Sequence, residues 1–136
     1  MNRVELEKRT LLFALKIIQF VATLPKTKAG EVVEFQLVKA GTSVGANYRE
    51  ATRAESRNDF IHKLAIVEKE SSESLYWLEL CQEAHFGKAE LRQWLMQEST
   101  ELLAIFTSAG RTSKARLQSS KIRNSQSAIR NSNKQP

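Results

Sequence analysis

The sequence predicts an all-α protein, an antiparallel up-down-up-down four-helix bundle with a disordered basic C-terminal tail. Apolar residues recur at steps of three and four through four successive segments, which is typical of helices with one buried face. The links between these segments are short, and short links join antiparallel neighbours in bundles. The 136 residues suffice for one domain. We divide it into a bundle over residues 1–110 and a tail over residues 111–136.

The first helix is expected over residues 5–24, because Pro25 follows its last apolar residue. Its apolar stripe steps by threes and fours and comprises Leu6, Phe13, Ile17, Phe20 and Leu24. Four further apolar residues widen that stripe, namely Leu11, Ala14, Ile18 and Val21.

The second helix is expected over residues 29–54. Its inward positions are Val33, Leu37, Ala40, Val44 and Ala51. Gly41 and Gly45 lie four apart on one face, although each glycine costs a helix about 1 kcal/mol relative to alanine. We expect this glycine face to pack closely against another helix.

The third helix is expected over residues 57–85, because Ser56 and Asp59 form a Ser-x-x-Asp capping pattern. Its seam alternates steps of four and three through Phe60, Leu64, Val67, Ser71, Ser74, Leu78 and Cys81. The fourth helix is expected over residues 89–109, with Gly110 as its C-terminal stop. Its buried residues are expected to be Leu91, Leu95, Leu102, Ile105 and Phe106.

Positive charge is concentrated in the tail. Residues 1–110 hold 14 Lys and Arg against 15 Asp and Glu, whereas residues 111–136 hold seven Lys and Arg and no acidic residue. The tail is poor in apolar residues and contains Ile-Arg-Asn-Ser twice, which predicts disorder. It is either a flexible nucleic-acid arm or a translated repetitive segment without a selected role, and the lack of aromatic residues for base stacking favours the second.

No arrangement typical of catalysis or cofactor binding stands out. Cys81 and His85 lie four apart on one helix, but two ligands do not make a zinc site. We therefore expect no enzyme, no cofactor and no metal. The N-terminus lacks the layout of a secretion signal, the most apolar run is too short to span a bilayer, and a single cysteine excludes an internal disulfide. These features predict a cytoplasmic protein without a membrane partner.

Two sets of exposed side chains are candidate contact residues. The first is cationic and comprises Arg49, Arg53, Arg57, Lys63 and Lys69. These groups either bind nucleic-acid phosphates or form surface salt bridges, and the salt bridges are favoured. In a salt bridge, Arg49 or Arg53 meets Glu70 or Glu73 across the bundle or across a subunit boundary. The second set is aromatic and predicts an assembly interface: Tyr48, Tyr76, Trp77 and Trp94.

The order of residues from Ser43 to Leu80 resembles a small bacterial four-helix-bundle family encoded in intervening sequences of 23S rRNA genes. That family has a Ser-Val/Ile-x-x-Asn-x-x-Glu core, then a turn and a helix with Lys-Glu, a second Glu and a Tyr-Trp pair. The matching residues are Ser43, Val44, Asn47 and Glu50, then Phe60, Lys63, Lys69, Glu70, Glu73, Tyr76 and Trp77. The resemblance covers roughly residues 5–110.

The resemblance implies a ring, with a homopentamer as the expected state, and RNA or another nucleic acid as partner. Accessory variability proteins of diversity-generating retroelements look like the same fold and support such a partner by analogy. The alternative is a protein-protein adaptor that does not contact nucleic acid. Nucleic-acid binding that is salt-dependent and persists without residues 111–136 would favour the nucleic-acid function over the adaptor function.

Overall fold

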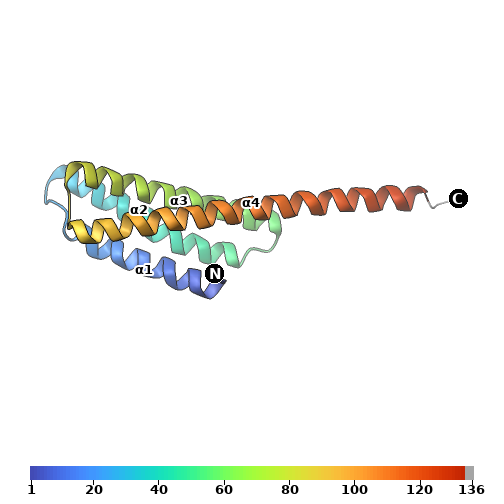
Figure 1. The fold of residues 1–136 in the computed structure, drawn as a ribbon, viewed down its shortest axis with the longest axis horizontal. Helices are drawn as coiled ribbons and strands as arrows, with labels where there is room; N and C mark the ends of the chain where they lie inside the picture. The colour runs from blue at the N-terminus through green and yellow to red at the C-terminus, as the bar shows by residue number, and fades with distance from the viewer. Residues whose placement is uncertain (134–136) are drawn as a thin grey trace.

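Four helices form an antiparallel bundle in the computed structural model, which describes residues 1–133. They are α1 (Arg3–Val21), α2 (Lys28–Thr52), α3 (Arg57–Ala84) and α4 (Ala89–Asn133). Each packs against its two neighbours in cyclic order, so α1 contacts α2 and α4, and α3 contacts the same two helices. The start of α1, the end of α2 and the start of α3 lie at the end of the bundle from which α4 projects (Figure 1). The predicted four-helix bundle is confirmed.

Local side-chain chemistry sets the helix boundaries. Asn2, Thr27 and Ser56 precede α1, α2 and α3, and each accepts a hydrogen bond from a backbone N–H in the first turn. The Ser56 cap confirms the predicted start of α3, because its hydroxyl lies 3.0 Å from the Asp59 nitrogen. The turn from α3 to α4 needs Gly87, whose φ of +80° favours glycine and whose added Cβ would lie 2.6 Å from Phe20 Cε1.

The core contains most of the predicted stripe residues. The predicted stripe of the first helix, Leu6, Phe13, Ile17, Phe20 and Leu24, is buried, and so are all five predicted inward residues of α2. The α3 seam is buried from Leu64 to Cys81, and its Ser71 and Ser74 hydroxyls donate to backbone carbonyls one turn earlier. Small seam residues therefore let α3 and α4 approach without leaving a buried hydroxyl unsatisfied.

The glycine face of α2 lies against α1. A Cβ added at Gly41 would lie 2.8 Å from Ile17 Cγ1, and one added at Gly45 would lie 3.0 Å from Thr10 Oγ1. Thr10 is itself fully buried, and its hydroxyl donates to the Leu6 carbonyl over 2.8 Å. The two glycines thus remove the side chains that would separate α1 from α2.

The C-terminal region differs from the sequence prediction, because α4 does not stop at Gly110 but continues as one helix to Asn133 (Figure 1). A glycine costs a helix only about 1 kcal/mol, and no further glycine and no proline follow before Asn133. An existing helix gains one hydrogen bond for each added residue, so extension avoids the cost of nucleation. The predicted disorder is therefore wrong for residues 111–133, because low apolar content indicates only that a segment has no core to pack against. Residues 134–136 of the predicted tail lie outside the described residues.

A second correction concerns the outer side of α1. Leu11 and Ile18 were expected to widen the buried stripe, yet they are 59% and 51% exposed. Each α1 residue turns the side-chain direction by about 100°, and the contacts with α2 and α4 leave this side of α1 uncovered. The apolar side of α1 is therefore wider than the part that α2 and α4 cover.

Candidate nucleic-acid and assembly surfaces

Three arginines from three helices surround an open hollow of about 800 Å³ at the end of the bundle where α4 emerges. Arg3 starts α1, Arg57 starts α3, and Arg116 lies one and a half turns beyond Gly110 on α4. Glu55 is the single carboxylate in the lining. The apolar part of the lining is supplied by Tyr48, Ala51, Phe60 and Ala109. We call this site the arginine hollow.

Tyr48 forms a rigid part of the hollow. Its ring is buried and lies 5.5 Å from the Phe106 ring, centroid to centroid. Burial raises the pKa of the Tyr48 hydroxyl, and the charge of Glu7 raises it further, while Arg3 lowers it. The hydroxyl is therefore neutral at physiological pH, and the charge of the hollow comes from its three guanidinium groups and Glu55.

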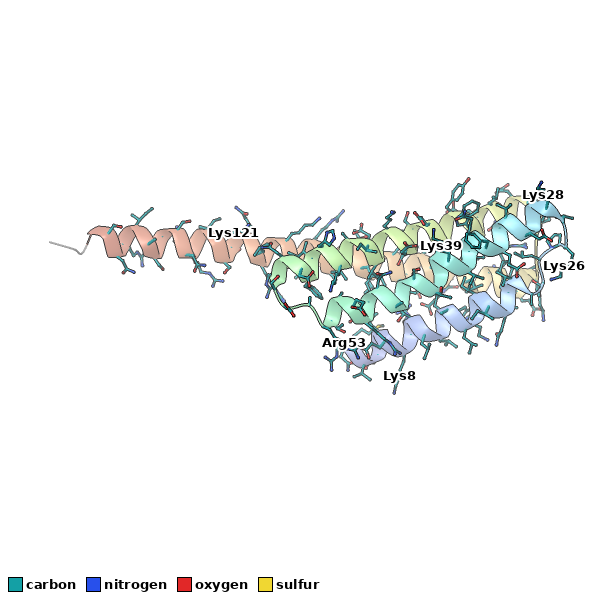
Figure 2. All side chains as sticks on the ribbon, turned by 180° about the vertical axis from the view of Figure 1, so that it is seen from behind. Lys8, Lys26, Lys28, Lys39, Arg53 and Lys121 are labelled. Atoms are coloured by element: carbon teal, nitrogen blue, oxygen red, sulfur yellow. The ribbon has the colours of Figure 1, made fainter. Side chains whose placement is uncertain are left out.

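The five cations selected from sequence do not form one surface. Arg57 lines the arginine hollow, whereas Arg49 borders a groove between α1 and α2 together with Glu7. Lys63 is paired with Asp59 over 3.4 Å. Arg53 caps the end of α2, at the end of the bundle from which α4 projects (Figure 2). Lys69 is exposed in mid α3 beside Glu70.

Within one chain, the pairing of Arg49 or Arg53 with Glu70 or Glu73 across the bundle is wrong, because these residues lie at different heights along the bundle. The tight connection between α2 and α3 places the end of α2 beside the start of α3. Lys39, near the middle of α2, therefore faces Glu70 and lowers the pKa of its carboxyl. Burial and Glu73 oppose that effect, and the net pKa of Glu70 is raised.

The sequence analysis missed Arg3 and Arg116, the partners of Arg57 in the hollow. An antiparallel bundle brings the starts of α1 and α3 together with the end region of α4, so Arg3 was open to inference from topology. Arg116 was not, because its position depends on the continuation of α4 past Gly110.

The sequence analysis also missed a hydrogen-bonded ion-pair network that links α1 to α4. Arg9 Nε donates to Glu98 Oε1 over 2.6 Å, and Arg9 Nη2 donates to Glu101 Oε2 over 2.7 Å. The hydrogen bond to Glu98 is the main cause that raises the pKa of Arg9. This three-residue network is structural: its positive charge is neutralised by two carboxylates, so it offers no free cation to a ligand.

The four aromatic residues of the expected assembly interface occupy different environments. Tyr48 is in the core of its own chain, so its placement on an outer surface is wrong. Trp77 is half-buried against the core and meets Tyr76 edge to face at 5.0 Å. Tyr76 is 57% exposed, and Trp94 is 37% exposed with the Lys16 ammonium 5.9 Å from its ring centroid.

An exposed apolar stripe runs along α1, and we call it the α1 stripe. Its members follow steps of seven, four and three, the spacing of a coiled-coil seam: Val4, Leu11, Leu15 and Ile18. Leu11 also borders a groove of about 350 Å³ between α1 and α2, which is lined by Ala14 and Ala46. Such a row of large side chains beside a shallow groove is typical of a helix-packing surface.

Metal-ligating residues do not cluster in the described part of the chain. Cys81 is buried, which raises the pKa of its thiol to about 11, whereas His85 is exposed in a left-handed cap at the end of α3. The thiol is therefore protonated and shielded, in agreement with its expected packing role. None of the helices within residues 1–133 is long and apolar enough to cross a membrane.

The chain is similar in sequence as well as in fold to known proteins. The family model of the 23S rRNA-intervening sequence protein matches residues 2–108. A crystal structure of a protein of unknown function from the S23 ribosomal protein family of Bacteroides thetaiotaomicron is 35% identical. The similarity covers 82% of this chain and 99% of that chain, with a TM-score of 0.73. No curated protein matches. A family match over most of the bundle shows that the chain belongs to the 23S rRNA-intervening sequence protein family.

Proposed function

We propose that this protein is a non-enzymatic, self-assembling four-helix bundle that binds RNA or another nucleic acid. The observation that carries the proposal is the arginine hollow, where Arg3, Arg57 and Arg116 meet at one end of the bundle. Arginine guanidinium groups bind phosphate through paired N–H donors, and three of them outweigh the one carboxylate in the lining. The family assignment supports the same partner class.

Phosphate binding at the hollow is tested by the salt dependence of affinity. A labelled RNA hairpin and a labelled DNA duplex are titrated with the full chain and with the Arg3→Gln/Arg57→Gln variant. Loss of two phosphate contacts should reduce the slope of log K against log salt by about 1.4 to 1.8. The control Lys26→Gln/Lys28→Gln removes the same charge at the opposite end of the bundle and should leave the slope unchanged (Figure 2). Binding without salt dependence, or equal effects of both variants, would contradict a role for the hollow.

Self-assembly is supported by the α1 stripe. Four large apolar residues in coiled-coil spacing remain exposed on one helix, and covering them with a second copy removes them from water. A cyclic ring requires a different patch on the facing copy. Phe35 on α2 and Tyr76 on α3 supply exposed apolar surface outside α1 for that contact.

The assembly is tested by size-exclusion chromatography with light scattering. Leu11→Lys/Leu15→Lys places two charges in the α1 stripe and should convert the oligomer to a monomer that retains its helical circular dichroism. Ile129→Lys changes an equally exposed apolar residue outside the bundle and should leave the mass unchanged. A monomeric parent protein would overturn self-assembly.

The second candidate, a protein-protein adaptor, is favoured by the same α1 stripe if a foreign helix covers it. It predicts partner binding that is insensitive to salt and is lost in Leu11→Lys/Leu15→Lys, with no nucleic-acid affinity in the parent. The salt titration above therefore separates the two functions.

A further inference from the structure

The part of α4 beyond Gly110 projects from the bundle as a single helix (Figure 1). Between residues 111 and 132 only Ser113 is buried, and only Leu117 and Ser120 are half-buried. We call residues 111–133 the α4 projection. It lies outside the family match, which ends at residue 108, so it is an addition to the shared bundle. A helix that buries so little surface gains little from packing against its own chain, so most of its side chains are accessible to a partner.

The charge of the α4 projection specifies the chemistry of that partner. It contains six Lys and Arg residues and no Asp or Glu. None of the six takes part in an ion pair within the described chain. Lys121 extends from the projecting helix, well away from the lysines and arginine labelled on the bundle in Figure 2. The partner is therefore an extended polyanion.

The cations form two rows along the helix. Arg116, Arg123 and Arg130 are seven residues apart, so they lie on one side and follow one another at intervals of about 10 Å. Lys114 and Lys121 lie on the other side, about 160° around the helix from the first row. The Ile-Arg-Asn-Ser repeat has this seven-residue period and accounts for the spacing of Arg123 and Arg130, while Arg116 continues the row outside the repeat.

A small polar face lies between the two rows. At about 100° per residue it contains Ser120, Asn124, Ser127 and Asn131, with Leu117 and Ala128 beside the lysine row, whereas Ser113 on the same face is buried in the bundle. Beyond Leu117 all these side chains are short, so they allow the helix axis to approach a surface closely. The asparagine amides offer paired donor and acceptor groups of the kind that contact adenine.

This arrangement fits the major groove of B-form DNA. The groove is about 12 Å wide, admits an α-helix and has a phosphate strand on each edge. The major groove of an RNA duplex is deep and narrow, and single strands need aromatic stacking that residues 111–133 lack. The apolar side of the projection has just Ile122 and Ile129 as large residues, too few for burial in a membrane interface.

We propose that the α4 projection binds in the major groove of double-stranded DNA. Arg116, Arg123 and Arg130 contact the phosphates of one strand, and Lys114 and Lys121 contact those of the other. The inference rests on the proposed nucleic-acid function and assigns its form. Arg116 belongs both to this row and to the arginine hollow. A DNA duplex that holds the α4 projection in its major groove therefore also approaches Arg3 and Arg57.

The test compares two variants of the full chain that lose equal charge. Lys121→Gln/Arg123→Gln/Arg130→Gln changes the projection outside the hollow, and glutamine has nearly the helix propensity of lysine and arginine. Lys26→Gln/Lys28→Gln/Lys39→Gln changes the bundle (Figure 2). Fluorescence anisotropy measures binding to a DNA duplex, an RNA duplex and single-stranded DNA of one sequence at several salt concentrations. Circular dichroism verifies the helix content of both variants.

We expect the parent to bind the DNA duplex most tightly. In the projection variant the slope of log K against log salt should be smaller by about 2.7, at about 0.9 per lost phosphate contact. The bundle variant should change the slope by less than one contact. Equal effects of the two variants, or tighter binding of the RNA duplex or the single strand, would overturn the groove assignment. Release of DNA by excess phosphatidylserine vesicles would reassign the projection to a membrane surface. Nucleic-acid binding that survives in the projection variant would refute only this inference, whereas no binding by the parent would refute the proposed function itself.

Discussion

The two halves of α4 show what supports a helix inside a bundle and outside it. From Ala89 to Gly110 the helix has a regular buried face with Leu95, Ser99, Leu102 and Phe106 against its neighbours. Beyond Gly110 the same helix continues with almost every side chain exposed. Backbone hydrogen bonding is continuous through both halves, so the difference lies in side-chain burial. Tertiary packing supplies the stability of the first half, while the second half depends on the helix it extends.

The largest expected difference between the halves follows from their apolar residues. Phe106 is fully buried and packs on Tyr48, whereas Ile129 is 61% exposed. Phe106→Ala should lower the free energy of unfolding by about 3–5 kcal/mol, because it removes contacts and leaves a cavity. Ile129→Ala should change it by less than about 0.5 kcal/mol. Urea denaturation monitored by circular dichroism measures both, and a large cost for Ile129→Ala would show that the projection packs on something.

A smaller effect is expected where the bundle has no room. Gly45→Leu inserts a side chain at a position whose Cβ would lie 3.0 Å from Thr10 Oγ1 and 3.4 Å from the Thr10 backbone carbon. Overpacking should lower the free energy of unfolding by about 1–3 kcal/mol, more than the gain of under about 1 kcal/mol in helix propensity. Glu50→Leu, at an exposed residue of α2 outside this contact, is the control and should be nearly neutral. A raised melting temperature for Gly45→Leu would contradict close packing of α1 and α2.

The sequence predicted the bundle well because burial and helical period agree there. The α2 and α3 seams alternate at helical spacing, and both are buried apart from the half-exposed Phe60 at the start of α3. The sequence predicts the length of α4 poorly, because low apolar content is no measure of disorder in a segment that continues an existing helix. Apolar content reports packing, and the projection lacks packing without lacking helical structure.

The candidate sites were less predictable for a geometric reason. Arg57 was identified, yet its partners Arg3 and Arg116 lie more than 50 residues away along the chain. Leu11 and Ile18 were assigned to the core because helical period alone does not tell how wide a face the neighbouring helices cover. Spacing within one helix therefore predicts which residues share a side, and the packing of several helices decides which sides remain exposed.

Gly110, at the junction of the halves, should give a small change of opposite sign. A Cβ at this residue would meet Glu68 Oε2 at 3.9 Å, an ordinary contact, so alanine fits. Gly110→Ala should raise the free energy of unfolding by about 0.5–1 kcal/mol and increase the helical signal of the projection. Gly45→Ala is the informative comparison, because its Cβ meets Thr10 more tightly and should forfeit that gain. A loss of stability in Gly110→Ala would mean that the junction needs the flexibility of glycine.

The smallest expected effect is electrostatic and belongs to the bundle alone. Burial is the main cause that raises the pKa of Glu70, and Glu73 adds to it. A carboxyl with a higher pKa in the folded than in the unfolded chain binds its proton more tightly when folded. The contribution of Glu70 to stability is therefore complete below the unfolded pKa, near pH 4.5, and is lost as pH rises through the folded pKa.

Glu70→Gln should remove this decline of stability with rising pH and make the variant slightly more stable than the parent at pH 7. Glu73→Gln should shrink the decline without abolishing it, because burial of Glu70 persists. Thermal melts between pH 4 and pH 7 measure the difference, and a Glu70→Gln variant that loses stability as pH rises just as the parent does would show that Glu70 ionises without cost in the bundle.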